Sequence, residues 1–241
     1  MSDYVTVLAL AALPAIANVG GGLLAEVLVI RRRTIGLVFQ WVAGMLLGVV
    51  GVELMPRALR ATHPWLVVLA FIMGGGFFLL LEEEILPKKK SDSMGEAIGR
   101  PWALFAGILV DLFITGVVIG AGVTVERKLG VLLAISLLVV DAPEGFLTIA
   151  NLRSHGVTIT TRLILLAALG ASVFLGATAG YVALQGHDPL AKLTLLAFAA
   201  GVLLTLVADE MLPQARESGD TGIVLLLGGF ATTAAFSVYV G

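Results

Sequence analysis

Two carboxyl groups and a proline stand near the middle of one apolar stretch, residues 129–152, in the sequence Asp141-Ala-Pro-Glu-Gly145. A charged side chain at the centre of a lipid-facing helix costs about 2.5–3.5 kcal/mol even on the lenient insertion scale. Asp141 and Glu144 are three residues apart, so they share one face of a helix. We therefore expect both carboxyl groups to face the protein interior, where they can bind a cation or carry protons.

A second apolar stretch, residues 102–125, contributes Asp111 and, four residues later on the same helix face, Thr115. Pro143 has no N–H group and so frees the carbonyl oxygen of Val139 in the neighbouring stretch. Two adjacent helices would then present three carboxylates, a hydroxyl and a loosened carbonyl. Such a set of oxygen atoms suits hard or borderline divalent cations. The alternative for each of these acids is a protonated carboxyl group that is hydrogen-bonded for packing alone.

The chain offers no basic side chain at the depth of these acids, because every lysine and arginine lies in a loop or at the end of an apolar stretch. An internal ion pair therefore cannot neutralise them, which leaves protonation or a cation that arrives from solution. Glu53 and Glu210 lie near opposite mouths of the expected bundle. They act there as relay sites or, alternatively, extend into the lipid headgroups.

The composition places these residues in a membrane protein: of 241 residues, 59% are hydrophobic and 13% are charged. Eight stretches reach the roughly 20 residues that a helix needs to cross the hydrocarbon. They lack the alternation of barrel strands, so the sequence predicts an all-α membrane protein with a single polytopic domain over residues 1–241. The expected helices cover residues 5–30, 35–55, 64–86, 102–125, 129–152, 160–184, 190–212 and 221–240.

The distribution of basic residues predicts the orientation. The connections after the odd-numbered stretches, with the stretch ends beside them, hold ten lysines and arginines, and the opposite side holds five. Because basic residues concentrate on the cytoplasmic side, both termini are expected outside the cytoplasm. The expected location is the cytoplasmic membrane, with the lipid bilayer as the main partner and no nucleic acid.

Two stretches match each other at a fixed offset: Ala43-Gly-Met-Leu-Leu47 aligns with Ala200-Gly-Val-Leu-Leu204, and a shared Glu-x-x-Pro ending aligns Glu53 with Glu210. The two stretches cross the membrane in opposite directions, so the match indicates an inverted repeat, with chance similarity of apolar helices as the alternative. The repeat predicts a 3+2+3 arrangement, in which helices one to three mirror helices six to eight around helices four and five. Such repeats place a substrate site near the midplane.

Together these motifs resemble the ZIP (Zrt/Irt-like) family of divalent metal transporters, and among its prokaryotic members the GufA-like branch. The resemblance rests on the eight-stretch plan, on Pro143-Glu-Gly145 and on the two matched Glu-x-x-Pro segments, and it covers nearly the whole chain. It implies a homodimeric helical bundle that carries zinc, manganese or iron(II) as substrate, with the metal site on helices four and five. No organic cofactor is expected.

The family patterns assign the ligands and show where this chain departs from them. The fifth-helix pattern Gln/Asn-Asx-x-Pro-Glu-Gly matches at Asp141 and Glu144, with Val140 in place of the first polar residue. The fourth-helix pattern His-Asn-x-Pro-Glu-Gly puts Asp111 where the histidine belongs and Thr115 where the glutamate belongs. The resemblance thus implies a single metal site in place of two. Carboxylate in place of imidazole favours harder ions, such as manganese or iron(II), over zinc.

Met45 matches a second-helix position that can supply a sulfur ligand, although packing is the commoner role for a buried methionine. The predicted function is secondary transport of a divalent metal cation, and the protein is not expected to be an enzyme. One alternative is a ZIP-like protein that binds metal or protons without transporting them. Another is an intramembrane aspartyl protease with Asp111 and Asp141 as its dyad, which the missing Gly-x-Gly-Asp motif disfavours.

Overall fold

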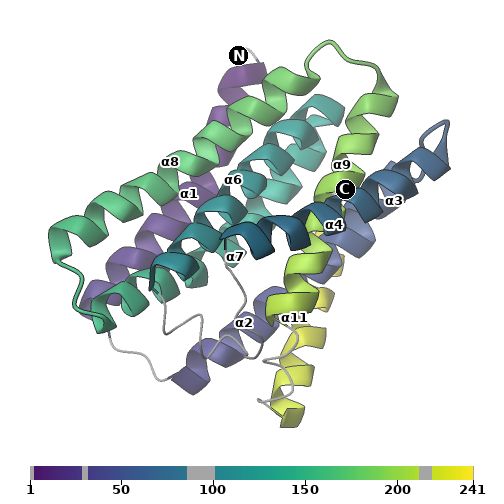
Figure 1. Ribbon diagram of the computed structural model, residues 1–241. Coiled ribbons are helices and arrows are strands. Elements are labelled where there is room, and N and C mark those ends of the chain that lie inside the picture. The colour runs from purple at the N-terminus through teal and green to yellow at the C-terminus, as the bar shows by residue number, and fades with distance from the viewer. Residues whose placement is uncertain (1–2, 29–31, 86–100, 212–218, 241) are drawn as a thin grey trace.

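The computed structural model describes residues 3–28, 32–85, 101–211 and 219–240, and in these ranges the protein contains helices and no strand (Figure 1). The all-helical prediction is thus confirmed for the described residues. The elements are α1 (Asp3–Val27), α2 (Arg32–Gly48), η1 (Val49–Leu54), α3 (Met55–Ala58), α4 (Pro64–Ile85), α6 (Pro101–Val125), α7 (Arg127–Ser154), α8 (Ile159–Leu184), α9 (Pro189–Leu206), η2 (Val207–Met211) and α11 (Gly219–Val240).

Seven helices of the described residues are long and apolar enough to cross a membrane, and a shorter apolar helix covers Pro64–Leu80. The chain is therefore a multi-pass membrane protein. An eighth full span stays a prediction, as does the orientation of the termini. Helices dominate because each backbone N–H and C=O group in a bilayer must find its partner within the protein.

Local signals in the sequence set the turns on either side of α8. Thr158 caps the start of α8 by accepting a hydrogen bond from the backbone N–H of Thr161, and Asp188 caps α9 in the same way. Gly156 and Gly186 follow the ends of α7 and α8 with φ angles of 75° and 79°. Glycine suits these positions because it has no Cβ to oppose a positive φ.

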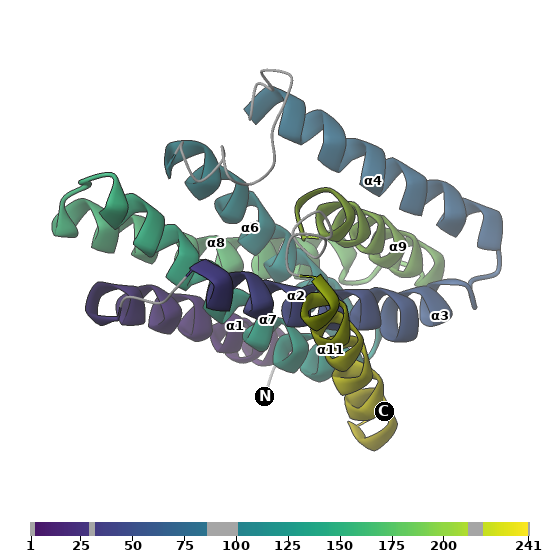
Figure 2. The ribbon, with the colours of Figure 1, turned by 90° about the horizontal axis from the view of Figure 1, so that it is seen from below.

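The helices pack in two groups. The first is a four-helix bundle in which α1 lies against α7 and α8, and α6 lies against α7 and α8 (Figures 1 and 2). The second consists of two helix pairs, α2 with α11 and α4 with α9. These pairs reach the bundle mainly through α2, which contacts α7, and through α9, which contacts α6. Helices α6 and α7 therefore contact both groups, and larger shares of them are buried, 61% and 67%, than of α1, α8 or α11.

Glycines at the crossings of the outer pairs repeat one geometry. Gly44 of α2 lies directly against the backbone carbonyl of Leu226 in α11, and Gly201 of α9 lies in the same way against Phe71 in α4. The offset that relates Gly44 to Gly201 is the one that aligns Glu53 with Glu210. The reciprocal contacts correspond as well: Gly229 meets the carbonyl of Trp41, and Gly74 meets the carbonyl of Phe198.

The same correspondence holds inside the four-helix bundle. Gly21 of α1 lies against the carbonyl of Ala142 in α7, and Gly176 of α8 lies against the carbonyl of Phe113 in α6. Reciprocally, Gly145 of α7 meets the carbonyl of Asn18, and Gly116 of α6 meets the carbonyl of Val173. The crossing of α1 with α7 thus corresponds to the crossing of α8 with α6, and Gly145 of α7 corresponds to Gly116 of α6.

Each of the two matched segments also contains a π-helical turn, η1 after α2 and η2 after α9. Glu53 lies in η1 and Glu210 lies in η2, so both turns contain the glutamate of the Glu-x-x-Pro ending. Such turns are rare and occur frequently at functional sites. The sequence analysis did not predict them, because a π turn differs from an α turn only in which carbonyl each N–H group selects.

The close helix crossings give a test of the packing on α4. In Gly74→Ala the new methyl group would overlap the backbone carbonyl of Phe198, so we expect the free energy of unfolding to fall by about 1–3 kcal/mol. Gly76→Ala is the matched control, because no atom lies within 4 Å of the position that its Cβ would take. Chemical unfolding of both variants in detergent measures the difference, and equal losses would contradict the packing described.

Candidate functional site

Helices α6 and α7 bring two of the predicted ligands into direct contact. The side chains of Asp111 on α6 and Glu144 on α7 are both buried and are joined by a hydrogen bond. A hydrogen bond between two carboxyl groups requires a proton on one of them. The pair lies inside the four-helix bundle, at the contact of the two helices that the outer pairs and the rest of the bundle enclose.

Asp141 is the third acid at this position. Its side chain is 0% exposed, and neither carboxyl oxygen has a hydrogen-bond partner among the residues that the structure describes. It lies close enough to Asp111 for their carboxylates to repel each other. An ionised carboxylate buried without a partner is strongly unfavourable. The arrangement therefore suits a ligand that supplies positive charge.

Neighbouring polar groups fix the backbone that carries these acids. The Nδ2 atom of Asn18 in α1 donates a hydrogen bond of 3.1 Å to the backbone carbonyl of Asp141. The hydroxyl of Thr148 donates a bond of 2.9 Å to the backbone carbonyl of Glu144. The bond from Asn18 and the contact of Gly145 with Asn18 hold the turn from Asp141 to Glu144 against α1, while the bond from Thr148 lies within α7. The sequence analysis missed Asn18, whose only signal is that it is a polar residue within an apolar stretch.

Thr115 is buried one helical turn after Asp111 on α6. The correspondence of Gly116 with Gly145 makes Thr115 the structural counterpart of Glu144, and Leu112 the counterpart of Asp141. The two inner helices therefore present similar backbones with different chemistry. Only α7 carries the Asp-x-x-Glu pair, while α6 contributes one acid and one hydroxyl.

Two other predicted site residues lie in α2 and η1, apart from the α6–α7 contact. Met45 is buried, and its backbone carbonyl accepts a 3.1 Å hydrogen bond from the hydroxyl of Thr233 in α11. Glu53 is 1% exposed and forms a 3.1 Å ion pair with Arg57, so the interpretation that it extends into the headgroups is wrong. Glu210 lies in η2, but its side chain is outside the part of the structure that is described.

The acids of α6 and α7 share one buried region without forming a ready-made cage. Among the described residues, no group of three or more His, Cys, Asp or Glu side chains is arranged to hold a metal ion. Shared coordination by Asp111, Asp141 and Glu144 would therefore require their side chains to turn toward a common point.

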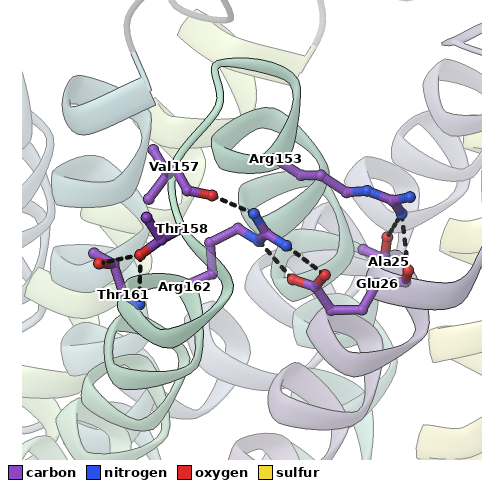
Figure 3. A network of polar contacts seen from close by, with 7 residues as sticks. All are labelled: Ala25, Glu26, Arg153, Val157, Thr158, Thr161 and Arg162. Atoms are coloured by element: carbon purple, nitrogen blue, oxygen red, sulfur yellow. Dashed lines mark hydrogen bonds and ion pairs between the residues drawn. The ribbon is translucent and has the colours of Figure 1, made fainter.

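A second polar network closes one end of the bundle (Figure 3). The guanidinium group of Arg162 in α8 donates two hydrogen bonds of 2.6 Å to the carboxylate of Glu26 in α1, and another to the backbone carbonyl of Val157. Arg153 of α7 donates bonds of 2.9 Å to the backbone carbonyls of Ala25 and Glu26. The network thereby joins the ends of α1, α7 and α8. In the sequence, the only signal for this network was that Glu26, near the end of its apolar stretch, and Arg162, near the start of its own, lie on the same expected side of the membrane.

A family model described as "ZIP Zinc transporter" matches residues 86–237, a range that contains Asp111, Thr115, Asp141 and Glu144. Comparison with curated proteins gives no match.

Exchanging charges across the Glu26–Arg162 pair tests the network. Removing one partner of a largely buried charged pair leaves the other uncompensated, so Glu26→Arg or Arg162→Glu alone should lower the free energy of unfolding by about 2–3 kcal/mol. The double variant should recover at least half of that loss, as measured by chemical unfolding in detergent. Additive losses in the double variant would show that the two side chains do not stabilise each other.

Proposed function

Because the chain belongs to the ZIP family, whose members transport divalent metal ions across membranes, we propose that it carries such an ion through a site on α6 and α7. The observation that supports this most directly is the fully buried Asp141, whose carboxyl oxygens have no partner among the described residues. The Asp111–Glu144 pair stands beside it. A divalent cation would supply the positive charge that three neighbouring acids require.

The proposed ligands are Asp111, Asp141 and Glu144, with the hydroxyl of Thr115 as a fourth donor. The set consists of oxygen atoms and contains neither imidazole nor thiolate. Manganese and iron(II) prefer oxygen ligands to soft ligands such as thiolate. A site made of oxygen ligands is also less selective for zinc than a site that contains histidine. Zinc, manganese and iron(II) are therefore the candidate substrates, with manganese and iron(II) favoured.

Glu53 and Glu210 are proposed as relay sites on the way to and from this centre. Support comes from their positions in the two π-helical turns, of which η1 contacts α7 and α9, and η2 contacts α2. Arg57 balances the charge of Glu53 in the described structure, so a passing cation would compete with Arg57 for that carboxylate. Met45 is buried in α2, where its backbone lies against Gly229 and Thr233 of α11, and a role for its sulfur as a ligand stays a prediction.

We also propose the 3+2+3 arrangement with an inverted repeat. The correspondence of the glycine crossings supports it, because it exchanges α1 with α8, α2 with α9, α4 with α11 and α6 with α7. Alternating access would follow from motion of the four-helix bundle, which contains the proposed ligands, against the outer pairs. The homodimer and the cytoplasmic membrane are proposed from the family resemblance, and the extracytoplasmic termini are proposed from the distribution of lysines and arginines.

Family membership favours transport over both alternatives, since ZIP proteins are transporters rather than enzymes. A protein that only binds metal would share the same buried acids and would differ in the absence of flux. A protease would need Asp111 and Asp141 to activate water, whereas Asp111 is engaged with Glu144 in the described structure.

Flux through purified protein tests the proposed function. In proteoliposomes the unmodified protein should take up manganese, and Glu144→Gln, which keeps the shape but removes the charge, should lower the initial rate at least tenfold. Glu126→Gln is the control, because Glu126 is exposed between α6 and α7, and its rate should stay within about twofold of the unmodified protein. Metal-dependent thermal stabilisation without flux would identify a binding protein, and equal rates in both variants would place the site elsewhere.

The oxygen ligand set predicts metal preference. We expect the unmodified protein to bind manganese about as well as zinc, and Asp111→His to shift the ratio toward zinc about tenfold, since imidazole favours zinc. Competition between the two ions, with thermal stabilisation in detergent as the readout, measures the ratio of their affinities. A strong zinc preference in the unmodified protein, unchanged by the substitution, would argue against Asp111 as a ligand.

A further inference from the structure

A line of polar residues continues along α7 beyond the proposed ligands. Glu144, Thr148 and Asn151 follow one another at intervals of four and three residues, so they lie on one face of the helix. We call these three residues the polar stripe. With a rise of about 1.5 Å per residue, Asn151 lies about 10 Å beyond Glu144, toward the turn that joins α7 to α8.

Asn151 is buried without being satisfied. Its side chain is 4% exposed, and neither its amide oxygen nor its amide nitrogen has a hydrogen-bond partner in the described part of the chain. Each unsatisfied buried polar group costs about 1–3 kcal/mol, and an apolar residue of the same size would avoid that cost. A buried amide of this kind therefore suits a position where a partner arrives from solution.

The stripe leads from the carboxylates to an exposed end. The proton of the buried Thr148 hydroxyl is engaged with the backbone carbonyl of Glu144, which leaves the lone pairs of the oxygen to accept a bond or bind a cation. Beyond Asn151, the exposed ring of His155 stands where α7 ends, with its Nδ1 atom 2.9 Å from the backbone carbonyl of Asn151. Polar groups thus follow one face of α7 from its buried middle to its surface end.

Packing alone does not require polar residues at these positions. Since Gly116 of α6 corresponds to Gly145 of α7, Thr148 corresponds to Ile119 and Asn151 corresponds to Gly122. Beyond Thr115, the counterpart of Glu144, the equivalent face of α6 is therefore apolar. The same helix geometry is built without a hydroxyl or an amide, so Thr148 and Asn151 are a chemical feature of α7 alone.

We propose that Asn151 and Thr148 form a second, uncharged binding station for the transported divalent cation, between the α6–α7 acids and the α7–α8 turn. This inference rests on the proposed function. The amide and hydroxyl oxygens bind the cation, or the water molecules that it retains, in place of bulk solvent. Because the donors are neutral, they hold the ion less tightly than the carboxylates do, and transport requires sites that an ion can leave as well as enter.

The experiment compares manganese flux in proteoliposomes with manganese-dependent thermal stabilisation in detergent. Asn151→Leu should lower the initial flux at least fivefold but leave the manganese concentration for half-maximal stabilisation within twofold of the unmodified protein. Asn151→Asp should lower the half-saturating manganese concentration at least threefold, because a carboxylate binds the ion more tightly. It should also lower the maximal flux at least threefold, because the ion leaves the carboxylate more slowly. A role in packing alone would not produce this joint change.

A matched pair of substitutions controls for the loss of a buried hydroxyl. Thr148→Val lies on the stripe and should lower flux at least twofold. Thr6→Val removes the buried hydroxyl of Thr6 in α1, which has no partner among the described residues, and should leave flux unchanged.

Full flux in Asn151→Leu, with flux in the unmodified protein, would overturn the station and leave the proposed function standing. Loss of stabilisation in Asn151→Leu would also overturn it, by assigning Asn151 to the fold or to the carboxylate site. Absence of flux in the unmodified protein would overturn both.

Discussion

Burying Asp141 is the constraint on which the rest of the structure depends. An ionised carboxyl group without a hydrogen-bond partner is unfavourable in an apolar interior. Asp141 has no such partner among the described residues, and it stands beside the acid pair of Asp111 and Glu144. All three acids are buried, between helices that pack against α1, α8 and the outer helix pairs. The backbone around them is fixed by Asn18 and by contacts between glycine and carbonyl groups that leave no room for a side chain. Within the described part of the chain Asp141 thus has no hydrogen-bond partner, and the proposed cation or a proton would neutralise its charge.

The geometry of the bundle is repeated, whereas its chemistry is not. Corresponding glycines set corresponding helix crossings in the two halves. The side chains at corresponding positions nevertheless differ: Thr115 of α6 corresponds to Glu144 of α7, and Leu112 corresponds to Asp141. The same difference continues along the polar stripe, opposite Ile119 and Gly122. Repetition of the backbone therefore supplies a symmetric framework, and a few side chains on α7 make the two inner helices chemically different.

Much of the fold and of the candidate site could be predicted from the sequence, because the strongest signals in the sequence are local. Runs of apolar residues predicted the helices, and Thr158, Asp188 and the glycines after α7 and α8 mark where turns occur. Because acids are rare in apolar stretches, the sequence predicted Asp111, Asp141 and Glu144 as ligands; all three are buried, and their role as ligands stays a prediction. The two ion pairs escaped prediction for different reasons. Glu53 and Arg57 are only four residues apart, but the burial of Glu53 depends on how η1 is covered, whereas Glu26 meets Arg162 from 136 positions away. Asn18 was missed for the same reason as the second pair, since its role is defined by a carbonyl on another helix.

The bridge between Glu26 and Arg162 makes the two ends of the four-helix bundle mechanically unequal. Separating a paired carboxylate and guanidinium would leave opposite charges in a poorly polar medium, so α1 and α8 resist spreading where the bridge joins them. At their other ends the same two helices meet through the rings of Tyr4 and Tyr181, whose centroids are 5.6 Å apart, and through a 3.2 Å hydrogen bond between the hydroxyls of Tyr4 and Thr178. Helices α1 and α8 are therefore joined by opposite charges at one end and by neutral contacts at the other, so separating them costs more on the side of the bridge.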